Sequence, residues 1–305
     1  MPGGEVANAG VEQRVAAALC GAGPVLGVDV GGSSTRAALI VDGEVRQRLL
    51  GGPFNFLLQD DGVTQLADLA RQARPAAMGV GVPGIAREPG AAGRMAAAIT
   101  EACGVPAQVA SDATVAWLGA FLGDPGIIVL AGTGSVAIGG RTPDGIAIIG
   151  GHGHLVGDEG SAYWIGRRAL RAALAARDGT GPATVLGEAL SAAAGATLDE
   201  IVHRAQRAPG DRSVLTALAP IAGRCAGEPD LDQVAGTILA DAAAALAALA
   251  GALRRRFGDL PVAGAGGVFA MCPVWAAFQQ ATGATGPLAP PEVGAALLLA
   301  REPPQ

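Results

Sequence analysis

The 305-residue chain contains no lysine: all 21 of its basic residues are arginine. This absence excludes several kinds of site. A P-loop ends in a lysine that contacts nucleotide phosphates, a protein kinase uses a strand lysine for the same purpose, and a Schiff-base enzyme needs a lysine amine. Phosphate chemistry in this chain must therefore rest on backbone N–H groups, hydroxyls, arginine or a bound cation.

Cysteine and positive charge are also scarce. Cys20, Cys103, Cys225 and Cys272 are scattered and no two form a C-x-x-C pair, so we expect no disulfide or structural zinc and take a reducing cytoplasm as the location. The net charge of −6 gives no electrostatic footprint for nucleic acid or an acidic membrane. The N-terminus lacks the pattern of a signal peptide, and we expect no apolar run of the roughly 20 residues that span a bilayer.

Aromatic residues make up only 3% of the chain, although 50% of its residues are hydrophobic, many of them alanine. A core of small aliphatic side chains with close approaches between backbones is expected. The length suffices for two domains of ordinary size.

The order of apolar runs and amphipathic stretches predicts an α/β protein whose pattern occurs twice. Three consecutive strands at 25–30, 36–41 and 44–50 precede strand–helix–strand units, which indicates a mixed sheet covered by helices. The breaking run at 123–126 precedes a second set of strands. We expect an N-terminal extension at 1–23, a first domain at 24–122 plus 290–305, and a second domain with a helical insertion at 123–289.

Two short apolar strands run directly into turns of glycine and hydroxyl residues. The first strand carries Asp29 and enters Gly31, Gly32 and Ser33; the second enters residues 132–135. Glycine lets bulky anions approach backbone N–H groups, and hydroxyls add donors. A carboxylate beside such a turn is where a magnesium ion and its waters would sit. Two such turns predict a duplicated fold with a phosphate loop on each side of a cleft, although an ordinary hairpin also explains a single one.

A third glycine turn follows the last predicted strand. Gly264, Gly266 and Gly267 leave a flat backbone face that suits the adenine and ribose of a nucleotide. Close packing of a helix on a strand explains these glycines equally well.

The fourth stretch, residues 150–166, holds two of the three histidines and two adjacent carboxylates. His152 and His154 beside Asp158 and Glu159 resemble a metal site, but the intervening glycines indicate an irregular loop. We interpret it as a loop that lays polar groups along a polyhydroxylated ligand, because a carboxylate can accept hydrogen bonds from two hydroxyls.

In this order the four stretches resemble N-acetylglucosamine kinases and their BadF/BadG relatives, in the superfamily of actin, hexokinase and heat-shock ATPases. The block at 132–165 is the most specific part, and the resemblance runs from about Val25 to Arg301. It implies two ribonuclease H-like (actin-like ATPase) domains, each a five-stranded mixed sheet with helices, and an active site in the interdomain cleft. It also implies ATP and Mg²⁺ as cofactors, a small sugar as substrate and a homodimer.

The resemblance also implies roles for single residues. Asp112 would be the base that accepts the proton of the sugar 6-hydroxyl, and its position after a strand, at the ligand-binding end of an α/β sheet, agrees with this role. A plain helix N-cap is the alternative. Asp29 would hold Mg²⁺. The further sugar-side positions are Asn55, Gly84, His152, Gly153 and Asp158. The nucleotide-side positions are Gly31, Gly32, Ser33, Thr133, Gly134, Ser135, Ala222, Gly223, Gly266 and Gly267.

The chain departs from these kinases at one position. Where they usually show Gly-Gly-Trp-Gly-His, it has His152 in place of the aromatic residue. The resemblance implies N-acetylglucosamine as the favoured substrate, and the departure at His152 keeps glucosamine and N-acetylmuramic acid as alternatives. Two other classes stay open: a BadF-type ATPase activator of acyl-CoA reductases or dehydratases, which needs cysteine thiolates for an iron–sulfur cluster, and a non-catalytic sugar sensor.

Overall fold

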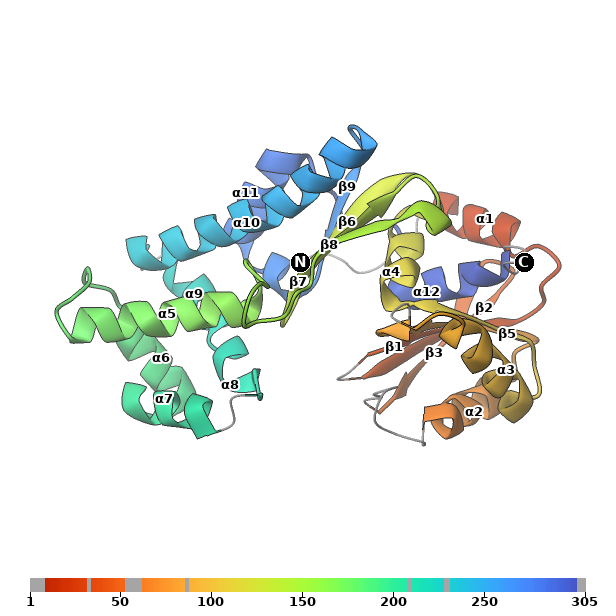
Figure 1. The fold of residues 1–305 in the computed structure, drawn as a ribbon, viewed down its shortest axis with the longest axis horizontal. Coiled ribbons are helices and arrows are strands. Elements are labelled where there is room, and N and C mark those ends of the chain that lie inside the picture. The colour runs from red at the N-terminus through yellow and green to blue at the C-terminus, as the bar shows by residue number, and fades with distance from the viewer. Residues whose placement is uncertain are drawn as a thin grey trace. The chain divides into compact units, whose positions relative to one another are not determined.

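The computed structural model describes residues 9–31, 34–52, 62–85, 88–207, 210–227 and 231–300. Gly32, Ser33 and Asn55 lie outside the described residues. The chain divides into two compact units (Figure 1). Unit 1 comprises Met1–Gly126, Gly140–Ile146 and Pro287–Gln305, and unit 2 comprises Ile127–Gly139 and Ala147–Gly286.

Unit 1 is built on a five-stranded mixed sheet with the order β3-β2-β1-β4-β5. β1 pairs antiparallel with β2 and parallel with β4, and β4 pairs parallel with β5. This confirms the mixed sheet that the sequence predicts for the first half. The strands are β1 (Val25–Val30), β2 (Thr35–Val41), β3 (Glu44–Gly51), β4 (Ala77–Val82) and β5 (Ala107–Ser111).

Helices pack on both faces of this sheet. They are α1 (Ala9–Ala18), α2 (Gly62–Ala73), α3 (Ala91–Cys103), α4 (Asp112–Phe121), α12 (Pro291–Ala296) and the 3₁₀ helix η4 (Leu297–Ala300). A further 3₁₀ helix, η2 (Pro143–Gly145), contacts α4. Successive side chains of a strand point to opposite faces. Leu26 and Val28 of β1 pack with α2 and α3, whereas Val25 packs with α1 and α12. Through Val15, α1 is thus part of the core of unit 1, although it lies in the segment expected to be an extension.

Glycines bring α12 to backbone distance from the sheet and from α4. A Cβ built on Gly27 of β1 would overlap the carbonyl oxygen of Glu292, and one on Gly294 of α12 would overlap the carbonyl oxygen of Val115. Only glycine fits at such contacts, because close-packed backbones leave no room for a side chain. The expected close approach of backbones is therefore present, and it locks α4, the helix that begins at Asp112, against α12.

Unit 2 has a four-stranded sheet in the described residues, with the order β8-β7-β6-β9. The prediction of a fifth strand in this sheet is wrong. Beside β9 there is one isolated parallel bridge in the described residues, between Ala263 and Thr285. Gly283 has a φ of +68° and Pro287 lacks an N–H, so the segment around Thr285 is too short to extend the ladder. The strands are β6 (Gly126–Ala131), β7 (Ser135–Gly140), β8 (Ala147–Gly150) and β9 (Val262–Ala265).

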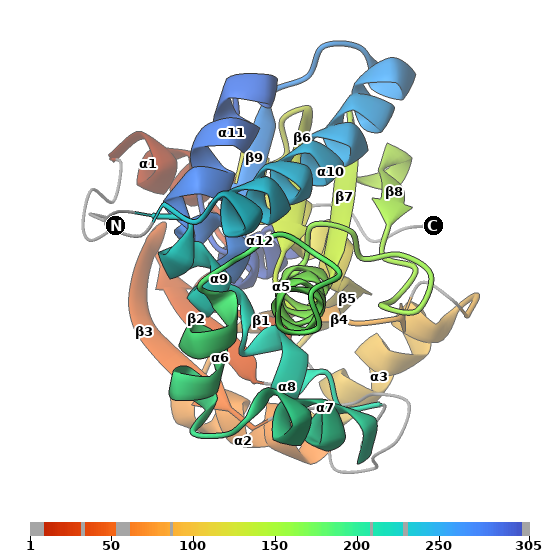
Figure 2. The same ribbon diagram turned by 90° about the vertical axis from the view of Figure 1, so that its left-hand side faces the viewer.

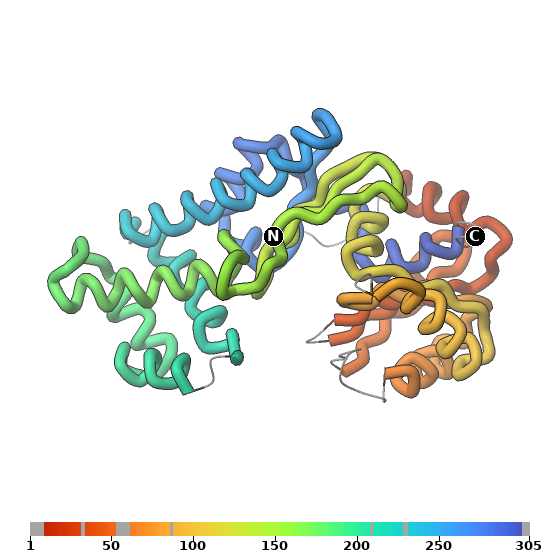
Figure 3. The backbone as a smooth tube through the Cα atoms, in the orientation of Figure 1, coloured from red at the N-terminus to blue at the C-terminus, as the bar shows by residue number. Residues whose placement is uncertain are grey.

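The rest of unit 2 is helical, and the chain can be followed in Figure 3 from β8 through a loop into α5. Figures 1 and 2 show α10 and α11 lying side by side. The helices are α5 (Ala162–Arg177), α6 (Leu186–Ala194), α7 (Leu198–Arg207), α8 (Ser213–Thr216), α9 (Ala219–Cys225), α10 (Gln233–Phe257), the 3₁₀ helix η3 (Gly267–Ala270) and α11 (Cys272–Thr282).

Helix α10 corrects one expectation. With 25 residues, it is the one helix in the described ranges that is long and apolar enough to cross a membrane by length and composition. The expectation that no segment has this length is therefore wrong. The apolar stripe of α10 nevertheless packs inside unit 2, where Ile238, Ala242, Leu246 and Leu253 are buried in the core, as the spacing of these residues predicts.

Candidate active site

Asp112 begins α4 but does not cap it. The N-cap is Ser111, whose Oγ accepts a hydrogen bond from the Thr114 backbone N–H at 3.0 Å. Asp112 is exposed, and its Oδ1 accepts a hydrogen bond from the Ala113 N–H at 2.9 Å. The alternative that Asp112 is a plain N-cap is therefore wrong. Its Oδ2 has no partner among the described residues and is open to a ligand.

Asp29, near the end of β1, lies among other carboxylates. Its own burial, followed by the negative charges of Glu292 and Asp112, raises the pKa of Asp29 to about 6, while the positive charge of Arg36 acts in the opposite direction. Arg36 is the residue paired with Asp29 on β2. A divalent cation would be attracted here, because it relieves the repulsion between carboxylates.

The donor set around Asp29 fits a magnesium ion that is held mainly by water and phosphate. Mg²⁺ usually keeps several waters and takes one or two carboxylates plus substrate phosphates. Within the described ranges, no three His, Cys, Asp or Glu side chains group closely enough to hold a metal alone. A single carboxylate such as that of Asp29 is compatible with an ion of this kind.

Two glycines of unit 1 follow strands of the sheet. Gly31 follows β1, and a Cβ added to it would lie 2.7 Å from the carbonyl oxygen of Ser34. Gly84 follows β4 with a φ of +75°, and nothing lies within 4 Å of the position of its Cβ. The expected partners of these residues, Gly32, Ser33 and Asn55, fall outside the described residues.

In unit 2 the turn at 132–135 joins β6 to β7. The Gly132 N–H donates to the Gly134 carbonyl oxygen at 2.9 Å, and the Gly132 carbonyl oxygen accepts from the Ala162 N–H, at the start of α5, at 2.8 Å. The Ser135 hydroxyl donates to the carbonyl oxygen of Glu159 at 2.7 Å. The turn is thus a hairpin tied to the loop before α5. The N–H groups of Thr133 and Gly134 have no partner among the described residues and remain available for an anion.

Asp158 is packed against this turn. It is only 5% exposed and has a φ of +62°, an uncommon conformation for a residue with a side chain. Its Oδ1 accepts a hydrogen bond from the Ser135 N–H at 3.4 Å, and a Cβ on Gly134 would lie 2.8 Å from its Oδ2. The structure therefore brings Asp158, expected on the sugar side, into direct contact with a turn expected to bind phosphate.

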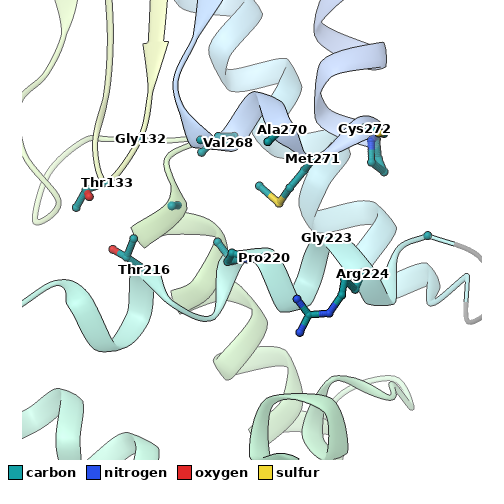
Figure 4. A pocket seen from close by; sticks show the side chains of 15 residues that line it. Gly132, Thr133, Thr216, Pro220, Gly223, Arg224, Val268, Ala270, Met271 and Cys272 are labelled. Atoms are coloured by element: carbon teal, nitrogen blue, oxygen red, sulfur yellow. The ribbon is translucent and has the colours of Figure 1, made fainter. Parts of the chain in front are cut away.

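A cavity of about 920 Å³ opens beside the turn within unit 2. Its walls are mostly apolar, and Figure 4 shows Thr133 and Thr216 at one end and Arg224 and Cys272 toward the other. The hydroxyl oxygen of Thr216 is buried and has no hydrogen-bond partner among the described residues. The residues that line the cavity are Gly132, Thr133, Ala162, Thr216, Ala219, Pro220, Gly223, Arg224, Gly227, Gly267, Val268, Ala270, Met271, Cys272 and Pro273.

The cavity gathers some of the expected nucleotide-side residues and not others. Thr133, Gly223 and Gly267 line it, whereas Ala222 is fully buried in the core of unit 2. Gly266 has a φ of +112° and touches the backbone of Ala131 in β6, so its role is to hold the η3 turn close to the sheet.

Thr216 and Met271 are among the lining residues that sequence analysis does not find. A Cβ added to Gly223 of α9 would lie 2.8 Å from the Sδ of Met271. The Met271 side chain therefore forms the cavity wall that faces α9. Neither residue belongs to a recognisable motif, so no local signal marks them.

The two histidines of the loop before α5 have different surroundings. His152 is exposed, whereas His154 packs edge-on against Tyr163, with ring centroids 4.8 Å apart. Gly153 between them has a φ of +86° and open space at its Cβ position. The irregular loop that the glycines predict is therefore present.

Comparison with known proteins gives a family and several relatives. The model of the BadF/BadG/BcrA/BcrD ATPase family matches residues 26–298. An N-acetylmuramic acid/N-acetylglucosamine kinase of Clostridium acetobutylicum is 45% identical over 78 residues, 26% of either chain. An N-acetyl-D-glucosamine kinase of Dictyostelium discoideum is 33% identical over 135 residues, 44% of this chain and 42% of that protein. The matches thus span less than half the length of these relatives.

A solved structure matches over nearly its whole length. The crystal structure of a candidate N-acetylglucosamine kinase from Chromobacterium violaceum has a TM-score of 0.72 and 30% identity, and the match covers 91% of this chain and 99% of that one. The actin-like ATPase fold that the resemblance implies is therefore confirmed.

Proposed function

The chain belongs to the BadF/BadG/BcrA/BcrD ATPase family, and on this premise we propose that it is an ATP-dependent kinase that phosphorylates an amino sugar at its 6-hydroxyl. The observation that carries the proposal is the exposed carboxylate of Asp112 at the start of α4. This carboxylate is not used to cap the helix, because Ser111 is the N-cap. The names of the relatives above support N-acetylglucosamine as the substrate and N-acetylmuramic acid as an alternative. Glucosamine is a second alternative, because His152 stands where the resembled kinases have an aromatic residue.

In the proposed reaction Asp112 takes the proton of the sugar 6-hydroxyl. The 6-oxygen forms a bond to the γ-phosphorus of ATP, the bond from that phosphorus to the bridging β–γ oxygen breaks, and ADP leaves. Positioning and charge stabilisation dominate such transfers, because the transition state is loose and its charge spreads over the phosphoryl oxygens. Magnesium, when bound, supplies positive charge, and Asp29 is the residue proposed to hold it.

The nucleotide is proposed to occupy the cavity of unit 2. Its mostly apolar walls suit an adenine ring, and Thr216 is one of the few polar residues that line it. The free N–H groups of Thr133 and Gly134 suit phosphate oxygens. Gly223 and Gly267 keep side chains out of the space.

On the sugar side we propose Asn55, Gly84, His152, Gly153 and Asp158. His152 and Gly153 lie exposed or half-buried on the loop before α5. Asp158 binds the Ser135 N–H through Oδ1, and a carboxylate keeps acceptor capacity for a hydroxyl after one such bond. We also propose that the protein is cytoplasmic, because its cysteines are scattered, and that it is a homodimer, as the resemblance implies.

The proposal is tested by measuring ADP release from Mg-ATP with a panel of sugars: N-acetylglucosamine, N-acetylmuramic acid, glucosamine and glucose. ADP release that depends on an amino sugar is expected. ADP release at the same rate without sugar would favour the BadF-type ATPase activator. Iron in anaerobically purified protein would then support that activator, since it carries an iron–sulfur cluster on cysteine thiolates.

A further inference from the structure

The turn proposed to bind phosphate has a negative charge beside it. The buried carboxylate of Asp158 touches Gly134 and accepts from the Ser135 N–H. A phosphate bound at the same turn would be repelled by this carboxylate, and the repulsion is strong where burial reduces solvent screening. A cationic side chain beside the turn would offset this repulsion, and the chain has no lysine to supply one.

Arg212 provides a cation at this place. Its Nη1 lies 3.9 Å from Oδ2 of Asp158, the same oxygen that faces Gly134. The Asp158 side chain is 4% exposed and that of Arg212 is 40% exposed, so the guanidinium lies between the buried carboxylate and open space. At 3.9 Å the contact is an ion pair without a close hydrogen bond, which leaves guanidinium donors free for phosphate oxygens.

The turn of chain that holds Arg212 also forms part of the cavity. Arg212 is the N-cap of α8, and its carbonyl oxygen accepts from the Thr216 N–H, one turn later, at 2.9 Å. Thr216 lines the cavity together with Thr133, and Figure 4 shows their side chains at the same end. One end of α8 therefore lines the cavity through Thr216, and Arg212 at the other end contacts the Asp158 carboxylate beside Gly134.

Arg212 is not among the residues that line the cavity, and the arginine that does line it is placed differently. Arg224 comes from α9 and, in Figure 4, lies across the cavity from Thr133. It is therefore remote from the free N–H groups of the turn, whereas Arg212 is held next to them through Asp158.

We propose that Arg212 binds the phosphate groups of the nucleotide, held in place by Asp158, and supplies the positive charge that lysine provides in other phosphate sites. This inference rests on the proposed function, because it takes ATP as the ligand. A planar guanidinium can bind two phosphate oxygens at once, so the same side chain can offset the Asp158 charge and orient the phosphates.

The test is calorimetric titration of the intact protein with Mg-ATP, ADP and adenosine, in wild type, Arg212→Gln and Arg212→Lys. Arg212→Gln is expected to weaken Mg-ATP binding by at least about tenfold and adenosine binding by less than about twofold, since a charged hydrogen bond to phosphate is lost. Arg212→Lys should recover part of the loss. Arg204→Gln, an equal change of charge on the exposed face of α7, is the control and should match wild type.

Three results would overturn the inference: unchanged Mg-ATP binding in Arg212→Gln, an equal loss for ATP and adenosine, or a loss confined to turnover of N-acetylmuramic acid, which would place the cation beside the sugar carboxylate. A wild type that binds Mg-ATP but phosphorylates no amino sugar contradicts the proposed function and still allows the comparison of ATP with adenosine. A wild type that binds no nucleotide contradicts both.

Discussion

The hydroxyl of Ser111 caps helix α4, and this leaves the carboxylate of Asp112, the next residue, free of that structural role. The structural role of capping this helix and the catalytic role proposed for Asp112 thus fall on different side chains. The separation allows each role to be tested without the other.

We expect Ser111→Ala to lower the free energy of unfolding by about 1 kcal/mol, the usual cost of losing an N-cap. Asp112→Asn should cost less than this, because the cap remains and only a first-turn charge is lost. Urea unfolding of the two variants measures the difference. A larger loss in Asp112→Asn would show that Asp112 supports the helix after all.

Asp29→Asn is expected to stabilise the protein at neutral pH and to leave its stability unchanged near pH 4. The pKa of Asp29 is raised from 3.8 to about 6, so the folded protein holds this proton more tightly than the unfolded chain does. Ionisation of Asp29 therefore opposes folding. The loss of folding free energy caused by this ionisation is absent below about pH 4 and grows as the pH rises through 6. It reaches at most about 3 kcal/mol.

Urea unfolding of Asp29→Asn and wild type between pH 4 and 8 checks this. Asp42→Asn, which removes the same charge from the exposed turn after β2, controls for net charge. A gain in stability that is equal at both ends of the pH range would contradict the assignment.

Gly294→Ala is expected to destabilise unit 1 by more than about 3 kcal/mol or to prevent its folding, because the new Cβ would overlap backbone atoms of Val115 and Gly119 that cannot move aside. Gly93→Ala in α3 is the matched control. Nothing lies within 4 Å of its Cβ position, so it should gain roughly 0.5–1 kcal/mol from helix propensity. Thermal unfolding compares the pair, and similar melting temperatures would refute the close packing of α4 on α12.

Gly223→Leu is expected to weaken ATP and adenosine binding together, by about tenfold or more, because its side chain would enter the cavity beside Met271. The KM for the sugar should stay unchanged. Gly236→Leu in α10, where the Cβ position is open, is the control. If adenosine binds Gly223→Leu with the same affinity as wild type, the nucleotide binds outside this cavity.

Much of the fold is predictable from local sequence. Periodicity predicts helices at 62–73 and 91–103, and α2 and α3 have those bounds. The run at 25–30 predicts β1 to the residue. These elements are predictable because short apolar runs end at glycine-rich turns and because helical stripes repeat at 3.6 residues. The missing fifth strand of unit 2 is the exception, since a single bridge at Thr285 depends on tertiary pairing.

The candidate site is predictable only where its residues lie in motifs. Thr133 and Gly267 belong to glycine turns and line the cavity as expected. Thr216 ends a four-residue helix without any motif and Arg212 directly precedes that helix, and Arg212 contacts Asp158, which lies 54 positions earlier in the chain. Such contacts arise from the packing of helices that no local pattern encodes.

The central claim, phosphoryl transfer from ATP to the 6-hydroxyl of an amino sugar with Asp112 as base, is tested most directly by phosphorus and proton NMR of the products. Wild type with Mg-ATP and N-acetylglucosamine should form N-acetylglucosamine 6-phosphate and ADP in equal amounts. Asp112→Asn should do so at least about 10²-fold more slowly, while Ser111→Ala, once shown to be folded, keeps most of the rate. ADP and inorganic phosphate without a phosphorylated sugar, or near-normal turnover by folded Asp112→Asn, would contradict the account.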